Sequence, residues 1–116
     1  MTDVTIYHNP GCGTSRNALA LLREKGIEPT VVEYLKAGWT RTQLKELLAR
    51  MEVPAHAILR TRGTNAEELG LTDPGVSDDA LIAAMIIEPI LVNRPIVVGP
   101  KGAALCRPAE LVLSLI

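Results

Sequence analysis

The stretch Tyr7–Arg16 (YHNPGCGTSR) places a cysteine between two glycines, where a reactive thiol is expected. An alternating apolar segment precedes it and a helical pattern follows it, so Cys12 lies in a predicted strand-to-helix turn. A thiolate at a helix N-terminus is stabilised by the helix dipole and by backbone N–H groups, which also form a cradle for an oxyanion. Gly11 and Gly13 leave the backbone accessible to a ligand. The stretch therefore predicts a cysteine nucleophile beside an anion site.

The residues after Cys12 argue against two kinds of thiol enzyme. Ser15 stands where a dithiol oxidoreductase has its second cysteine, so any disulfide of Cys12 must form with an outside thiol. A cysteine phosphatase has an arginine six positions after its nucleophile, but that position is Ala18 here. Cys106, the other cysteine, ends an aliphatic segment and is expected to be buried and unreactive.

Three arginines outside the turn, Arg60, Arg94 and Arg107, are candidates for binding an oxyanion. A guanidinium keeps its charge and offers a rigid fork of donors, which suits a tetrahedral anion. Arg94 precedes Pro95 and is expected to point toward Cys12, and Arg107 stands where the last strand gives way to the last helix. For any one of them taken alone, a solvated surface position is the simpler explanation.

Polar residues in and before the turn have two interpretations each. His8 either stabilises the thiolate or forms a local hydrogen bond at the end of the strand. The hydroxyls of Thr14 and Ser15 either cap the following helix or contact an anion.

Elements that position these residues follow from hydrophobic periodicity and from turn signals. Four strands are expected, the first two parallel and the last two paired in a hairpin around Gly99–Gly102. The predicted strands are Val4–Tyr7, Thr30–Tyr34, Pro95–Val98 and Ala103–Cys106. Helices are expected from the turn to Lys25, from a capping box at Thr40 to Met51, from Ser77 to Pro89, and from Pro108 to Leu115.

This order of elements is that of an α/β, thioredoxin-like three-layer fold with a four-stranded mixed sheet. We expect residues 1–116 to form one domain with a helical insertion at roughly 40–89, between the second and third strands. In such folds a cis-proline precedes the third strand and faces the active turn, and Pro95 occupies that position. The acidic segment 65–88, which has no Lys or Arg, is expected to be a solvated face with acids at a helix N-terminus.

Composition and net charge argue against several kinds of binding partner. The net charge is −1 and the pI is about 6.1, so no overall field favours nucleic acid or an anionic membrane. No signal-peptide pattern or long apolar run is present, and a cytoplasmic protein is expected. The cysteines and histidines lack metal-site spacing, so no bound metal is expected.

Several motifs together resemble the arsenate reductases that work with glutathione and glutaredoxin. The matching segments are Ile6–Asn17, Leu59-Arg60, Leu69–Leu71, Ile90–Val98 and Leu105–Pro108. The turn alone is shared with several thioredoxin-like relatives, but its combination with Asn93-Arg94-Pro95 and Cys106-Arg107-Pro108 is specific. The segment after Arg60 matches less closely than the rest.

The resemblance implies an oxidoreductase that reduces arsenate to arsenite for arsenic detoxification. It implies that Cys12 is the nucleophile, that His8 tunes it, and that the three arginines bind arsenate. Thr14, Ser15, Gly13 and Pro95 would support the site. No bound cofactor is implied: glutathione is the reducing cosubstrate, and glutaredoxin clears the mixed disulfide before arsenite leaves.

Two other interpretations remain open. Spx-type transcriptional regulators share the fold and bind RNA polymerase, but they typically carry C-x-x-C in the turn, which Ser15 disfavours. An arsenate-reductase-like protein could use the same turn on glutathione or another thiol without acting on arsenate. Retention of all three arginines disfavours that interpretation.

Overall fold

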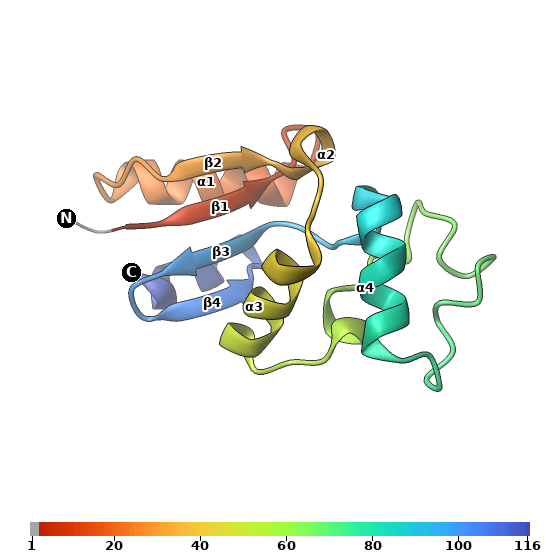
Figure 1. Cartoon of the computed structure of the whole chain (residues 1–116). Coiled ribbons are helices and arrows are strands. Elements are labelled where there is room, and N and C mark those ends of the chain that lie inside the picture. Colours follow the sequence, from red (N-terminus) through yellow and green to blue (C-terminus); the bar gives the residue numbers. More distant parts are fainter. Residues whose placement is uncertain (1–2) are drawn as a thin grey trace. The chain divides into compact units, whose positions relative to one another are not determined.

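The computed structural model describes residues 3–116, which form two compact units. One unit contains the chain up to Ala37 together with Arg94–Ile116, and it holds the sheet (Figure 1). The other unit, Gly38–Asn93, holds the helices inserted between the second and third strands. The interpretation of the whole chain as one domain with an insertion at roughly 40–89 stays a prediction.

The sheet is mixed and has the order β2-β1-β3-β4. Its strands are β1 (Thr5–His8), β2 (Thr30–Glu33), β3 (Ile96–Gly99) and β4 (Gly102–Leu105). β2 is parallel to β1, whereas β3 pairs antiparallel with both β1 and β4. The predicted strand pairing and hairpin are therefore confirmed.

Strand ends differ from the prediction by about one residue, as is usual where pairing gives way to a turn. Tyr34 was expected in the second strand but begins the short helix α2 (Tyr34–Ala37), where its side chain is fully buried. Cys106 was expected in the fourth strand but follows β4. Its N–H still donates to the Pro95 carbonyl (2.8 Å), so the hairpin pairing extends to the residue before β3.

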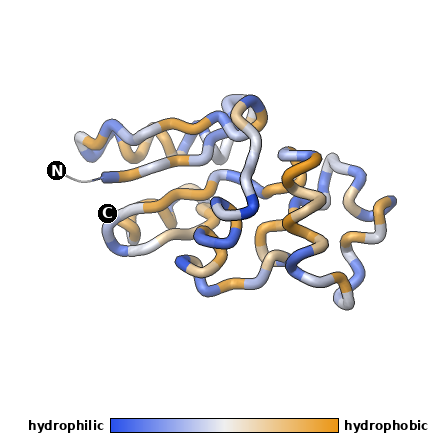
Figure 2. The backbone as a smooth tube through the Cα atoms, viewed as in Figure 1, coloured by the Kyte–Doolittle hydropathy of each residue, from blue (hydrophilic) through white to orange (hydrophobic). Residues whose placement is uncertain are grey.

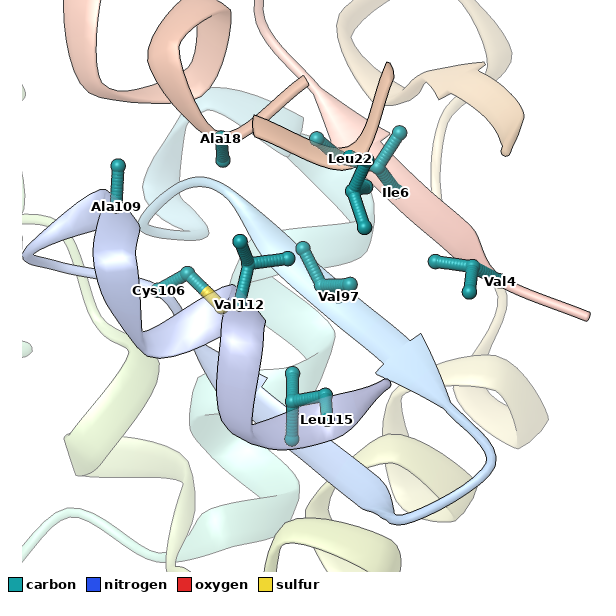
Figure 3. Close-up of a cluster of buried hydrophobic side chains, with 9 residues drawn as sticks. All are labelled: Val4, Ile6, Ala18, Leu22, Val97, Cys106, Ala109, Val112 and Leu115. Atoms are coloured by element: carbon teal, nitrogen blue, oxygen red, sulfur yellow. The ribbon is translucent and has the colours of Figure 1, made fainter. Parts of the chain in front are cut away.

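One face of the sheet is covered by α1 (Gly13–Glu24) and by η3 (Ala109–Leu115), a 3₁₀ helix rather than an α-helix. Their apolar sides meet strand residues in a single aliphatic cluster (Figure 3). The cluster consists of Val4, Ile6, Ala18, Leu22, Val97, Cys106, Ala109, Val112 and Leu115. Because this chain has no phenylalanine, close packing of small aliphatic side chains excludes water here. The core therefore fixes the middle and the C-terminal part of α1 relative to the sheet.

α1 ends as its sequence predicts. Gly26 has φ +77°, a left-handed conformation that glycine adopts without steric cost, and its N–H donates to the Arg23 carbonyl (3.0 Å). The Ile27 N–H then donates to the Leu22 carbonyl (3.0 Å), which satisfies a second carbonyl of the last turn.

Gly99 in β3 gives a test of the packing between the hairpin and η3. A Cβ at this position would overlap the backbone oxygen of Leu115, which also accepts the Lys101 N–H at 3.2 Å. We expect Gly99→Ala to lower the free energy of unfolding by about 1–3 kcal/mol, because backbone rather than a flexible side chain must move. Urea denaturation measures this, and an unchanged midpoint would mean that η3 yields without cost.

The second unit contains α3 (Arg41–Met51), η1 (Ala55–Ile58), α4 (Asp78–Ile87) and η2 (Pro89–Leu91). The predicted capping box is present: Gln43 N–H donates to Thr40 Oγ1 (3.1 Å), and Thr40 N–H donates to Gln43 Oε1 (3.2 Å). Ser77 caps α4 as expected, accepting the Ala80 N–H (3.2 Å). Figure 2 shows that α4 is hydrophobic along most of its length.

The acids at the start of α4 form specific contacts in addition to favourable interactions with the helix dipole. Asp79 lies 3.4 Å from Arg41 and 3.5 Å from Lys45, both on α3. Asp78 accepts the Ala55 N–H (3.1 Å). The acidic segment is thus partly neutralised by basic residues outside it.

Across residues 3–116, no helix combines the length and apolar character needed to cross a membrane.

Candidate functional site

Cys12 is the N-cap of α1, with an extended backbone (φ −102°, ψ 122°). Its N–H donates to the Asn9 carbonyl (3.0 Å), and its own carbonyl accepts the Arg16 N–H (3.0 Å), the first bond of the helix. The turn therefore delivers the thiol to the open end of α1, where backbone donors are not used within the helix. This is the position that the sequence predicts.

Cys12 is 7% exposed, and the pKa of its thiol is lowered from the ordinary value. Burial acts in the opposite direction, because it disfavours the charged thiolate. The backbone N–H of Ser15, the Arg107 guanidinium, the charge of Arg94 and the N–H of Thr14 outweigh burial by stabilising the negative sulfur. The helix terminus and two arginines thus favour the nucleophilic form of the thiol.

Arg107 links the backbone of Arg94 to the thiol of Cys12. Its Nη1 lies 3.7 Å from Cys12 Sγ and donates to the Arg94 carbonyl at 3.0 Å. The Arg94–Pro95 peptide bond is cis, as predicted, and the Arg107–Pro108 bond is cis as well. The expected proximity of Arg107 to Cys12 is therefore seen within this unit, and the charge of Arg94 contributes to the lowered pKa of the Cys12 thiol. That the Arg94 side chain points toward Cys12 stays a prediction.

His8 is buried on β1, with its Nδ1 2.6 Å from Ser15 Oγ. Burial lowers the pKa of the imidazole; Glu33 raises it, and Arg23 and Arg16 lower it further. These effects together favour the neutral form of the ring. Within residues 3–116 its hydrogen-bond partner is the Ser15 hydroxyl, so the structure favours the local bond over direct contact with the thiolate.

The Ser15 hydroxyl turns back toward the strand. Besides meeting His8, Ser15 Oγ accepts the Asn9 N–H at 3.1 Å. It thereby joins β1, the turn and the first turn of α1. Sequence reasoning left open whether Ser15 caps the helix or binds an anion, and it did not identify this link. The three-residue spacing of Ser15 and Ala18 indicates that Ser15 lies on the buried side of α1, but it does not identify His8 as the hydrogen-bond partner.

Arg60 belongs to the second unit and lies in a turn after the β-bridge between Leu59 and Val92. Its N–H donates to the Leu91 carbonyl (2.8 Å), and its Nε donates to the Arg62 carbonyl (3.0 Å). Thr64 Oγ1 in turn donates to the Arg60 carbonyl at 2.8 Å. The guanidinium is thus held against its own turn by a backbone acceptor.

Cys106 differs from Cys12 in the direction of its pKa shift and is more completely buried. It is fully buried in the aliphatic cluster, and burial raises its pKa to about 12. Its Sγ lies 3.7 Å from the Ala104 carbonyl. We expect iodoacetamide at pH 8 to modify Cys106 at least about 100-fold more slowly than Cys12, because so little of its thiol is ionised or accessible.

Peptide mass spectrometry of timed samples measures both alkylation rates in the same molecule. Denaturation in urea before alkylation should make the two cysteines similar. Equal rates in the folded protein would contradict the assignment of Cys106 to the closed core.

A metal ion would need several histidine, cysteine or acidic side chains close together. Residues 3–116 contain no cluster of three or more histidine, cysteine or acidic side chains placed for this purpose. The site around Cys12 consists of a thiol, backbone donors and guanidinium groups.

Comparisons with known proteins agree on one family. The sequence profile of the ArsC family matches residues 7–115. An arsenate reductase from Rhizobium meliloti is 54% identical over 113 residues, covering 97% of this chain and 81% of the relative. One from Escherichia coli is 50% identical over 116 residues, covering 100% of this chain and 82% of the relative.

Solved structures give the same grouping. An arsenate reductase from Vibrio cholerae superposes with a TM-score of 0.93 at 42% identity, covering 99% of this chain and 98% of that one. A putative arsenate reductase from Yersinia pestis gives a TM-score of 0.88 at 45% identity, covering 96% and 98% of the two chains. The α/β fold with a mixed four-stranded sheet is therefore shared with these proteins.

Proposed function

Because this chain belongs to the ArsC family, we propose that it is an arsenate reductase, an oxidoreductase that converts arsenate to arsenite. The observation that carries the proposal is the contact of Arg107 Nη1 with Cys12 Sγ at 3.7 Å. It puts a permanent positive charge beside a thiol whose pKa is already lowered. A nucleophile and a group that stabilises an oxyanion thus occur at one point.

In the first chemical step, the thiolate of Cys12 is the nucleophile that attacks arsenate. Its sulfur forms a bond to arsenic(V), and one arsenate oxygen leaves as water after protonation. Negative charge stays on the remaining oxygens, which the guanidinium groups of Arg94 and Arg107 neutralise. The N–H groups of Thr14 and Ser15, which stabilise the free thiolate, also lie close to this charge.

Arg60 is proposed as a third arsenate ligand. Support comes from the family motif Leu59-Arg60 and from the bond between Arg60 Nε and the Arg62 carbonyl, which restricts the side chain. A guanidinium held in this way loses less conformational entropy when it binds an anion.

Other residues of the turn have supporting roles in this proposal. His8 acts through Ser15, whose hydroxyl lies 2.6 Å from the imidazole. Gly13 leaves room at the helix terminus, and Pro95, the residue before β3, is proposed to face the turn.

The reducing electrons are proposed to come from outside thiols. Ser15 occupies the position of a second cysteine, and Cys106 is closed off in the core, so Cys12 has no internal thiol to pair with. Glutathione supplies one thiol and glutaredoxin clears the resulting mixed disulfide. Over one cycle two thiols become a disulfide, arsenic gains two electrons, and one oxygen leaves as water. No bound cofactor is needed, and the proposed setting is arsenic detoxification in the cytoplasm.

Coupled oxidation of NADPH tests the proposal. Purified protein is incubated with glutathione, glutathione reductase and glutaredoxin, and absorbance is followed with and without arsenate. We expect NADPH consumption that requires arsenate, glutathione and glutaredoxin together, with arsenite as the product. A folded protein with no arsenate-dependent consumption across several glutaredoxins would favour a thiol-binding or regulatory protein instead.

A further inference from the structure

Asn9 makes three hydrogen bonds around the nucleophile without touching its sulfur. Its side-chain Oδ1 accepts the Gly11 N–H (2.9 Å), and its carbonyl accepts the Cys12 N–H (3.0 Å). Its own N–H donates to Ser15 Oγ (3.1 Å). The residue therefore contacts the chain before, at and after the thiol.

These bonds fix the backbone of the turn in two ways. The Oδ1 bond closes a side-chain turn of the kind that asparagine forms with the backbone two residues on. The carbonyl bond to Cys12 closes a backbone turn over the same residues. A Cβ at Gly11 would lie only 3.3 Å from Asn9 Oδ1, which shows how closely this amide sits against the chain.

The direction of the thiol depends on this turn. Cys12 Sγ meets Arg107 at 3.7 Å, a distance that a modest backbone rotation at Cys12 would lengthen. Two hydrogen bonds restrict this rotation. The Cys12 carbonyl accepts the Arg16 N–H on the side of the helix, and the Asn9 carbonyl accepts the Cys12 N–H on the side of the strand. We propose that Asn9 is a positioning residue that holds Cys12 in register with Arg107 through the bond from the Gly11 N–H to its side chain.

This inference rests on the proposed role of Cys12 as nucleophile, but its test does not need arsenate. The measurement is the second-order rate of iodoacetamide alkylation of Cys12 at pH 7, with the pH dependence followed by thiolate absorbance. For Asn9→Ala we expect a fall of about five- to tenfold in rate, because the turn loses its side-chain acceptor. Asn9→Ser should recover part of the rate, since a hydroxyl forms the same turn more weakly.

Asn9→Asp separates geometry from charge. A carboxylate can accept the Gly11 N–H as the amide does, so the turn is kept, but its negative charge disfavours the thiolate. We expect its alkylation profile to move to higher pH while urea stability stays close to that of the parent. Asn17, an exposed residue of α1, supplies the matched control: Asn17→Ala should alkylate at the parent rate.

A folded Asn9→Ala that alkylates at the parent rate would overturn the inference, and so would equal losses in Asn9→Ala and Asn17→Ala. If Asn9→Ala does not fold, Asn9→Ser and Asn9→Asp are compared at a pH where Cys12 is fully ionised: the weaker turn of Asn9→Ser should give the slower alkylation, and equal rates would exclude the positioning role. Failure of the arsenate reductase proposal would appear separately, as normal alkylation without arsenate-dependent turnover.

Discussion

Replacing Cys12 with serine is expected to lower arsenate-dependent turnover by at least about 10³-fold, because a hydroxyl is a far weaker nucleophile than a thiolate. The change is nearly isosteric, so the turn, which is held by backbone bonds of Cys12, should persist. Oxyanion binding should also persist in part, because the guanidinium groups are untouched. The coupled assay measures turnover, and protection of the protein by arsenate against thermal unfolding measures binding.

Cys106→Ala is the matched control for this variant. Both changes remove a thiol. Because Cys106 lies in the closed aliphatic cluster, its replacement by alanine is expected to affect stability rather than turnover. An inactive Cys106→Ala that remains folded, alongside an active Cys12→Ser, would reverse the assignment of the nucleophile.

Replacing Arg107 with alanine is expected to have the next largest effect, a fall of about 10²–10³-fold in kcat/KM, or about 2.7–4 kcal/mol of transition-state stabilisation. Two contributions combine here. The guanidinium beside Sγ stabilises the thiolate, so its loss raises the pKa of Cys12 and moves the pH–rate profile to higher pH. The same group is proposed to neutralise charge on the arsenate oxygens.

Arg107→Lys separates the two contributions. An ammonium restores positive charge near Cys12, so part of the pKa effect should return. It cannot offer the planar guanidinium fork that is proposed to bind the arsenate oxygens, so kcat/KM should remain low. Iodoacetamide rates against pH measure the first effect and steady-state kinetics measure the second. Parent activity in both variants would remove Arg107 from the site.

The features that could be predicted from the sequence are those with a local cause. The capping box at Thr40 and the cap at Ser77 depend on residues three positions apart, and both are confirmed. The strand pairing followed from alternation and turn signals. The cis bond at Pro95 followed from the order of elements that surrounds it.

The features that could not be predicted depend on side-chain direction. The bond of Ser15 to His8 requires that both point into the space between β1 and α1, which spacing alone does not specify. The contact of Arg107 with the Arg94 carbonyl joins residues that are brought together only by the hairpin. Whether Arg60 approaches Cys12 depends on the arrangement of two units, and its role stays a prediction.

The β3–β4 hairpin limits which changes of turn length the molecule tolerates far from its thiol. Gly99 and Gly102 form the last pair of β3 and β4, so only Pro100 and Lys101 lie in the connecting turn. The length of this turn determines which residue at the other end of the hairpin stands opposite Pro95, and here it is Cys106, followed by Arg107. Inserting or deleting one residue would reverse the alternation of side chains between the two faces. We therefore expect this turn, although remote from the thiol, to accept substitutions more readily than the insertion or deletion of a residue.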